Sequence, residues 1–149
     1  MHMEICNFDK RFSKQVSALI RNTIREINSK DYSKEIIEKM CIRFSEENII
    51  NRLSNREMIL MIENEEVIGT ASLKGNIILT VFVGVNVQGK GIGTKLMRYL
   101  EKMASKKGFK KVSLPSSITS VSFYKKLGYK IIEEIIDDSG KNIIMEKIL

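Results

Sequence analysis

The spacing of apolar residues predicts helices in the first third of the chain. Between residues 13 and 27 apolar side chains recur every three or four positions, as on one buried face of a helix. Ser13 is expected to cap this helix, because its hydroxyl oxygen can accept a hydrogen bond from a free amide of the first turn. Ser33, followed by Glu35 and Ile36, begins a second helical segment, and residues 45–53 continue in the same character.

From residue 58 the pattern becomes that of strands. Residues 58–62, 67–73 and 77–83 are rich in apolar and β-branched residues. Turn-forming residues separate them, namely Asn64-Glu65-Glu66 and Gly75-Asn76. Three short strands joined by tight turns predict an antiparallel meander.

Helices and strands alternate in the second half of the chain. Residues 91–107 are predicted as a helix that ends at Gly108, residues 112–114 as a short strand, and residues 118–127 as a helix that ends at Gly128. Residues 129–136 and 142–148 are predicted to form a hairpin around Asp137-Asp138-Ser139-Gly140. We therefore expect a single domain, residues 1–149, of the α/β or α+β class, with a mixed sheet and helices on its faces.

The composition is that of a globular protein. The chain has 149 residues, 43% of them hydrophobic, which excludes a disordered or collagen-like chain. Its longest apolar run, residues 77–85, is far shorter than the ~20 residues that span a membrane. The amino terminus is too polar for a signal peptide, so we expect a cytoplasmic protein without membrane contact. Cys6 and Cys41 are far apart and His2 is the single histidine, so we expect neither a metal site nor a disulfide.

The positive charge is concentrated in one segment. The net charge is +7, and residues 86–111 carry eight Lys or Arg against one acidic residue, while the remaining residues carry equal numbers of both signs. A charge this local, beginning at a glycine-rich turn, favours a compact anionic ligand. For Lys102, Lys106 and Lys107 a solvated helix face is the simpler interpretation.

Three closely spaced glycines precede this charged helix. Gly89, Gly91 and Gly93 follow a buried strand, so their backbone amides can approach a ligand without hindrance from a Cβ atom. The helix dipole favours negative charge at the same place, as in sites that bind a diphosphate. The loop of nucleoside triphosphatases does not fit, because Gly91 replaces its Ser or Thr, and the dinucleotide fingerprint fails at Thr94.

The pattern Gln88-x-x-Gly91-x-Gly93 resembles the acetyl-CoA signature of the GCN5-related N-acetyltransferase (GNAT) superfamily. A second segment, Ser117-x-x-Ser120-x-x-Phe123-Tyr124-x-x-x-Gly128-Tyr129, resembles the second motif of that family, and together the two motifs cover residues 80–130. The chain departs from the family pattern in having Ser120 for Ala, Val85 for Pro and Tyr129 for Phe. The resemblance implies a mixed, mostly antiparallel sheet that is flanked by helices and splayed between its fourth and fifth strands.

The resemblance also implies roles for individual residues. Backbone amides would bind the pyrophosphate of acetyl-CoA, those of Gln88, Gly89, Gly91, Gly93 and Thr94, with Lys90 and Lys95 adding electrostatic attraction. Val83 and Val85 would pair with the pantetheine arm, and the Val83 amide would polarise the thioester carbonyl. Ser117 would lie beside the cofactor. Tyr124 would lie near the sulfur, where a phenol that is protonated at neutral pH can act as a general acid. For Phe123 packing of its helix on the sheet is the expected role.

No residue stands out as the general base. Residues 77–85 contain no acidic side chain, and Glu63, Glu65 and Glu66 are interpreted as solvated charges of a turn. Asp31 and Tyr32 are the remaining candidates, in the loop between the first two helices that often shapes the acceptor pocket in the proteins this chain resembles.

We expect an N-acetyltransferase that transfers acetyl from acetyl-CoA, without a metal, to a primary amine of a small molecule or peptide. Direct attack is favoured over an acyl-enzyme, because neither cysteine has a histidine nearby in the sequence. One alternative is a non-catalytic regulator that binds acyl-CoA. A small basic nucleic-acid-binding protein ranks third, because only 7% of residues are aromatic and none is Trp. The identity of the acceptor and the formation of a homodimer stay open, since the first 85 residues are balanced in charge.

Overall fold

The computed structural model describes residues 2–138 and 140–149, so Ser139 of the expected turn lies outside the described residues. A seven-stranded sheet has the order β1-β2-β3-β4-β5-β7-β6. Every neighbouring pair is antiparallel except β4 and β5, which confirms the mixed, mostly antiparallel sheet. The strands are β1 (Met3–Asn7), β2 (Glu57–Glu63), β3 (Glu66–Lys74), β4 (Ile77–Val83), β5 (Lys111–Ser117), β6 (Lys130–Asp137) and β7 (Gly140–Ile148).

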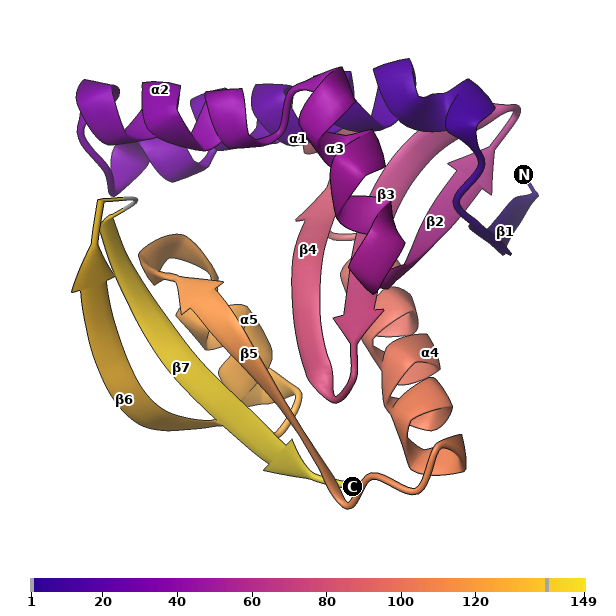
Figure 1. The fold of residues 1–149 in the computed structure, drawn as a ribbon, viewed down its shortest axis with the longest axis vertical. Coiled ribbons are helices and arrows are strands. Elements are labelled where there is room, and N and C mark those ends of the chain that lie inside the picture. The colour runs from indigo at the N-terminus through magenta and orange to yellow at the C-terminus, as the bar shows by residue number, and fades with distance from the viewer. Residues whose placement is uncertain (1, 139) are drawn as a thin grey trace.

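The sheet is split between β4 and β5. Among the described residues these strands are paired at one position, Ile77 with Ser113. Figure 1 shows the strands diverging from this point, so that the sheet forms a V with β1 to β4 in one arm and β5 to β7 in the other. The expected splay is thereby confirmed, and beyond Ile77 it leaves one side of β4 without a paired strand.

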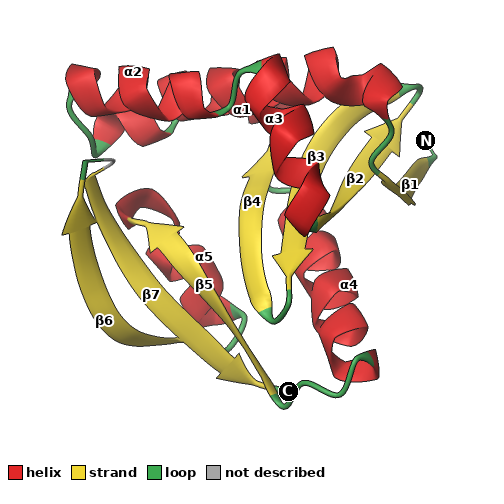
Figure 2. Ribbon diagram, viewed as in Figure 1, coloured by secondary structure: helices red, strands yellow, loops and turns green. Residues whose placement is uncertain are grey.

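Helices cover both faces of the sheet (Figure 2). On one face lie α1 (Ser13–Glu26), α2 (Lys34–Arg43) and α3 (Glu46–Arg52), and on the other lie α4 (Ile92–Lys106) and α5 (Val121–Lys126). Side chains of β2 alternate between two cores: Ile59 packs with the α4 side and Leu60 with the α1 side. No helix of the described chain combines the length and the apolarity that crossing a membrane requires.

Short 3-10 helices connect several of these elements. They are η1 (Lys10–Phe12), η2 (Asn28–Lys30), η3 (Leu53–Asn55), η4 (Val85–Val87) and η5 (Ile118–Ser120). The helix predicted over residues 118–127 is therefore two pieces, η5 followed by α5.

The helix starts follow the sequence signals at two of three places. Ser33 and Ser45 cap α2 and α3, each through a bond from an amide of the first turn to its hydroxyl oxygen. The prediction for Ser13 is wrong: η1 precedes α1, Ser13 is already helical, and its hydroxyl donates to Glu46 Oε1 (3.1 Å). Strand β1 was not predicted.

Strand β4 contains a bulge at its centre. The register with β3 shifts between Thr70, opposite Phe82, and Ser72, opposite Leu79. Thr80 has a φ of 56°, which is rare for a β-branched residue, and the hydroxyl of Thr70 donates to its carbonyl oxygen (2.7 Å). The bulge bends β4 beside the split in the sheet.

Candidate active site

The glycine-rich loop presents free backbone amides at the start of α4. Gly89 and Gly91 both have a φ of 78°, and a Cβ atom on either would meet nothing within 4 Å. Lys95 donates the first bond of the helix, to the Gly91 carbonyl (3.1 Å), so the amides before it have no helical acceptor. In the described chain, none of the amides of residues 88–94 is bonded to a backbone carbonyl. Lys90 and Lys95 are exposed next to them.

Gly93 differs from the other two glycines because it is buried. A Cβ atom at position 93 would lie 2.9 Å from Cζ of Phe123 and 3.5 Å from Cγ2 of Val83. Glycine is therefore required here for close packing of α4 against α5 and β4, and Phe123 has the packing role expected for it.

The backbone at the end of β4 faces the split between β4 and β5. The Gly84 amide donates to the Ile68 carbonyl (2.9 Å), and Val83 lies opposite Gly69. Because neighbouring residues of an antiparallel pair alternate in direction, the N–H and C=O of Val83 point away from β3. The side chain of Gln88 donates to the Val83 carbonyl (2.7 Å), a contact that the sequence motif does not show. Val85 follows the strand and belongs to η4.

Tyr124 lies on the opposite arm of the V. The residue is 6% exposed, and its ring contacts Phe123 and Tyr129 edge to face, with centroids 5.1 Å and 5.9 Å apart. Burial raises the pKa of the hydroxyl above its ordinary value. No protein group in the described chain is hydrogen-bonded to this hydroxyl, which can therefore serve a ligand as a protonated donor.

A cavity of about 550 Å³ joins these groups. Residues of the glycine-rich loop line it together with β4, with the end of β5 and with α5, and the helices of the other face contribute as well. Of the predicted site residues, it is lined by Val83, Gln88, Gly89, Gly91, Gly93, Thr94, Ser117 and Tyr124. Val85 and Lys90 are not among the lining residues.

Ser117 lies at the end of β5, where its hydroxyl donates to that of Ser120 (3.2 Å). Asp31 and Tyr32 do not line the cavity. The Tyr32 hydroxyl accepts from the Ile118 amide (2.8 Å) and donates to the Lys141 carbonyl (2.9 Å), while Asp31 accepts from Thr119 (2.8 Å). These bonds tie the loop between α1 and α2 to the second arm of the sheet.

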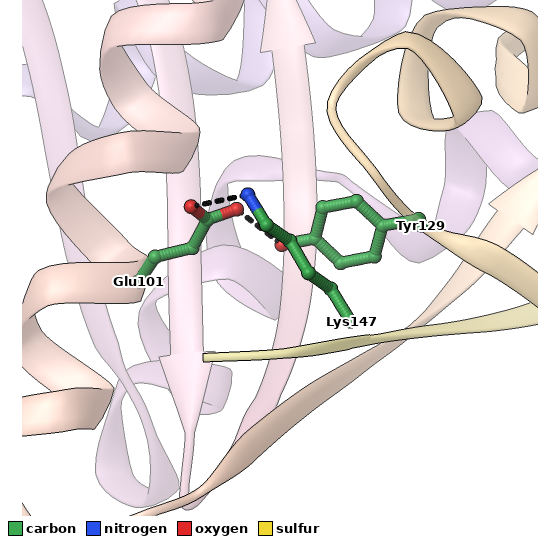
Figure 3. Close-up of polar contacts among 3 residues, drawn as sticks. All are labelled: Glu101, Tyr129 and Lys147. Carbon is green, nitrogen blue, oxygen red and sulfur yellow. Dashed lines mark hydrogen bonds and ion pairs between the residues drawn. The ribbon is translucent and has the colours of Figure 1, made fainter.

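A polar cluster links α4 to the second arm of the sheet (Figure 3). Glu101 of α4 accepts a bond from the Tyr129 hydroxyl (2.7 Å) and an ion pair from Lys147 of β7 (3.0 Å). Burial, followed by the bond to Glu101, raises the pKa of Tyr129 far above its ordinary value. Since Tyr129 contacts Tyr124, the cluster fixes α4 relative to the ring that faces the cavity.

Comparison with known proteins agrees with this geometry. No curated protein sequence matches the chain. The crystal structure of a GCN5-related N-acetyltransferase from Rhodopseudomonas palustris is similar, with 25% identity, a TM-score of 0.91 and coverage of 100% of this chain and 99% of that one.

Two further similar structures contain coenzyme A. The PaiA N-acetyltransferase from Thermoplasma acidophilum has 25% identity, a TM-score of 0.85 and complete coverage of both chains. An aminoglycoside 6'-N-acetyltransferase has 21% identity, a TM-score of 0.70 and coverage of 97% and 96%, and therefore shows the fold alone. The model of the acetyltransferase (GNAT) domain matches residues 28–149. The chain thus belongs to the GNAT family of acetyltransferases.

Proposed function

We propose that the protein transfers an acetyl group from acetyl-CoA to the primary amine of a small molecule by direct attack. The observation that carries this proposal is the row of free amides from Gln88 to Thr94, which opens into the same cavity as the Tyr124 hydroxyl. The backbone amides can bind a diphosphate, and the Tyr124 hydroxyl can contact a thioester elsewhere in the same cavity.

The residues fit acetyl-CoA. The open space above Gly89 and Gly91 admits a diphosphate close to the backbone, and Lys90 and Lys95 contribute positive charge. The unpaired side of β4 can bond an extended amide-containing arm as a further strand does. The hydrogen bond from the Gln88 side chain to the Val83 carbonyl must break before the arm can donate a bond to that carbonyl. Ser117, at the end of β5, lines the same cavity and can contact the arm there.

Bound acetyl-CoA would supply a thioester. The bond between its carbonyl carbon and the sulfur would be replaced by a bond between that carbon and the amine nitrogen. The Val83 amide donates a hydrogen bond to the thioester oxygen, where negative charge develops during attack. Tyr124 donates its proton to the departing sulfur and regains one from solvent. No Asp, Glu or His of the described chain lines the cavity, so water accepts the proton that the amine releases.

The size of the cavity favours a small acceptor. The 550 Å³ cavity has the size of a small-molecule site, and it must also admit the end of the pantetheine arm.

Calorimetry with coenzyme A and an assay of free thiol release over an amine panel test the proposal. We expect binding of coenzyme A together with thiol release that depends on an amine. An absence of heat with coenzyme A would overturn the assignment of the glycine-rich loop. Tight binding without thiol release from any amine would instead identify a regulator that binds acyl-CoA.

A further inference from the structure

Three arginines gather on the face of the cavity that is remote from the glycine-rich loop. Arg43 is the last residue of α2, Arg52 is the last residue of α3, and Arg56 immediately precedes β2. All three line the cavity. Figure 1 shows α2 and α3 across the sheet from α4, so the helices that end in Arg43 and Arg52 lie on the face opposite to the helix that follows the glycine-rich loop.

Several acidic residues of the neighbouring elements have other partners. Glu35 of α2 pairs with Lys39, Glu46 of α3 accepts a bond from Ser13, and Glu57 of β2 pairs with Lys107. In the described chain the residues that line the cavity include these three arginines and no Asp or Glu.

The arginines lack a compensating charge. Within the described residues none of them forms an ion pair. Arg52 lies over the ring of Phe44 at 5.3 Å, and Arg56 Nε donates to the side-chain oxygen of Asn55 (3.1 Å). Burial lowers the pKa of Arg52 and of Arg56, and repulsion by Arg56 and Arg43 lowers that of Arg52 further.

Position in the helices explains part of this arrangement. Cations stabilise the last turn of a helix, which accounts for Arg43 and Arg52 individually. It does not account for the convergence of three guanidinium groups, two of them partly buried, on one cavity without an acid. An anionic group bound between them would remove the repulsion and would satisfy donors in a geometry that guanidinium favours.

Aromatic rings connect this charge to the reacting strand. The Phe44 ring contacts the Phe82 ring edge to face, with centroids 5.5 Å apart. Phe82 lies between Val81 and Val83 on β4, and Met40 lines the same wall. The side chains between Arg52 and the backbone of β4 are thus apolar. They suit a substrate whose amine and second polar group are joined by a short hydrocarbon chain.

We propose that the acceptor is a small primary amine that also carries a carboxylate or phosphate group, which Arg52 and Arg56 bind with Arg43 at the rim. This inference rests on the proposed function and names its substrate class. Amines whose remaining groups are cationic, such as polyamines and aminoglycosides, would place positive charge against the arginines and would be poor acceptors.

The test compares amines of equal length. Aminohexanoate, hexylamine and diaminohexane differ only in their terminal group, so they compare a carboxylate with a neutral and a cationic group. Phosphoethanolamine and ethanolamine compare the presence and absence of a phosphate. We expect kcat/KM for the anionic member of each set to be roughly ten-fold or more above the others. Arg52→Met and, separately, Arg56→Met should remove this preference by lowering kcat/KM for the anionic member of each set, and Arg52→Lys should restore part of it.

Two controls separate the possible causes. Arg25→Met removes an exposed arginine of α1 that does not line the cavity, and it should alter nothing. The second control compares the affinity for coenzyme A with the affinity for the form that lacks the ribose phosphate. Arg52→Met should not weaken binding of one of these two compounds more than binding of the other. A selective loss for intact coenzyme A would overturn the inference, because the arginines would then bind the cofactor phosphate.

Binding is measured independently of catalysis, by saturation-transfer NMR of aminohexanoate and diaminohexane with the protein saturated with coenzyme A. Binding of the acid alone, lost in Arg52→Met, supports the inference even if no thiol is released. Equal binding or equal turnover of both amines overturns it and leaves the acetyltransferase proposal standing. Failure of acetyl-CoA itself to bind overturns the proposed function instead.

Discussion

Gly93 of α4 and Phe123 of α5 are in contact across the two arms of the V, so closely that a Cβ atom on Gly93 would lie 2.9 Å from Phe123 Cζ. The Phe123 ring also packs edge to face on Tyr124, which limits its movement. The contact therefore fixes the spacing between the amides of the glycine-rich loop and the hydroxyl that faces the cavity.

We expect Gly93→Ala to destabilise the protein by about 1–3 kcal/mol, because overpacking forces the ring or the helix to shift. Thermal or denaturant unfolding measures the change. Phe123→Leu introduced into the Gly93→Ala chain should recover part of the loss. Independent, additive effects of the two substitutions would show that the contact does not couple these residues.

Tyr124→Phe should lower kcat by about 10²-fold or more while coenzyme A binding stays unchanged, since the ring contacts remain and only the proton donor is removed. Stopped assays of thiol release and calorimetry measure the two quantities. Phe123→Leu serves as a comparison that alters the neighbouring packing but keeps the hydroxyl. An unchanged kcat in Tyr124→Phe would exclude this hydroxyl as the general acid.

Thr70→Val removes the hydroxyl that bonds to the Thr80 carbonyl in the bulge of β4. We expect a loss of about 1–2 kcal/mol in unfolding free energy and a several-fold decrease in kcat, because the cleft-facing backbone of β4 loses this support. Ser72, two residues along β3, is a matched control: its hydroxyl is buried and has no hydrogen-bond partner in the described chain. Ser72→Ala should therefore leave stability unchanged or raise it, and the same cost in both variants would contradict this role of Thr70.

Stability should fall at alkaline pH. The pKa values of Tyr124 and Tyr129 are raised in the folded state, so above about pH 10 the unfolded chain loses protons that the folded chain retains. The contribution of these two tyrosines to the unfolding free energy is then constant below this pH and decreases as the pH rises toward their folded-state pKa values. Denaturant titrations at a series of pH values measure the slope.

Tyr129→Phe isolates one of these two groups. It should lower stability at neutral pH by about 1–2 kcal/mol, because the bond to the Glu101 carboxylate is lost, and it should make the alkaline decrease shallower. An unchanged slope would mean that Tyr129 ionises equally in both states.

Electrostatic attraction by the glycine-rich loop should appear in the salt dependence of coenzyme A binding. Lys90→Ala and Lys95→Ala should each weaken binding by a few-fold at low ionic strength, with the difference shrinking as salt is added. Lys74→Ala, an exposed lysine at the end of β3, is the control and should have no effect. Equal affinities at all salt concentrations would limit binding to the backbone amides.

The sequence predicted the elements that repeat a strong local pattern. The apolar periodicity of a segment predicted β2, β3, β4 and α4. A serine marked the start of α2 and of α3. Each of these signals lies within a short segment, so local interactions determine the element. Strand β1 was missed because five residues near the amino terminus form a strand through pairing with β2, more than fifty residues away. The bulge at Thr80 was missed for a similar reason: residues 77–83 have the pattern of a regular strand, and the neighbouring Thr70 supports the deviation.

The sequence indicated the glycine-rich wall of the cavity but not its arginines. The glycines occupy closely spaced positions in one segment, whereas Arg43, Arg52 and Arg56, which we propose to bind the acceptor, lie at the ends of separate helices and beside a strand. Counting charges along the chain hid this cluster, since the acids that balance the arginines in number are not among the described residues that line the cavity. A signal for the Glu101 cluster did exist: Glu101 is the one acid among residues 86–111, and Tyr129 adds a hydroxyl where the family pattern has Phe.

The cavity is lined from both faces of the split sheet, with the glycine-rich loop on one face and the arginines on the other. Two substrates that approach from opposite faces and meet at β4 can occupy the protein simultaneously, and neither has to leave before the other enters. Initial-rate plots should accordingly intersect rather than run parallel, and free coenzyme A should inhibit competitively against acetyl-CoA but not against the amine.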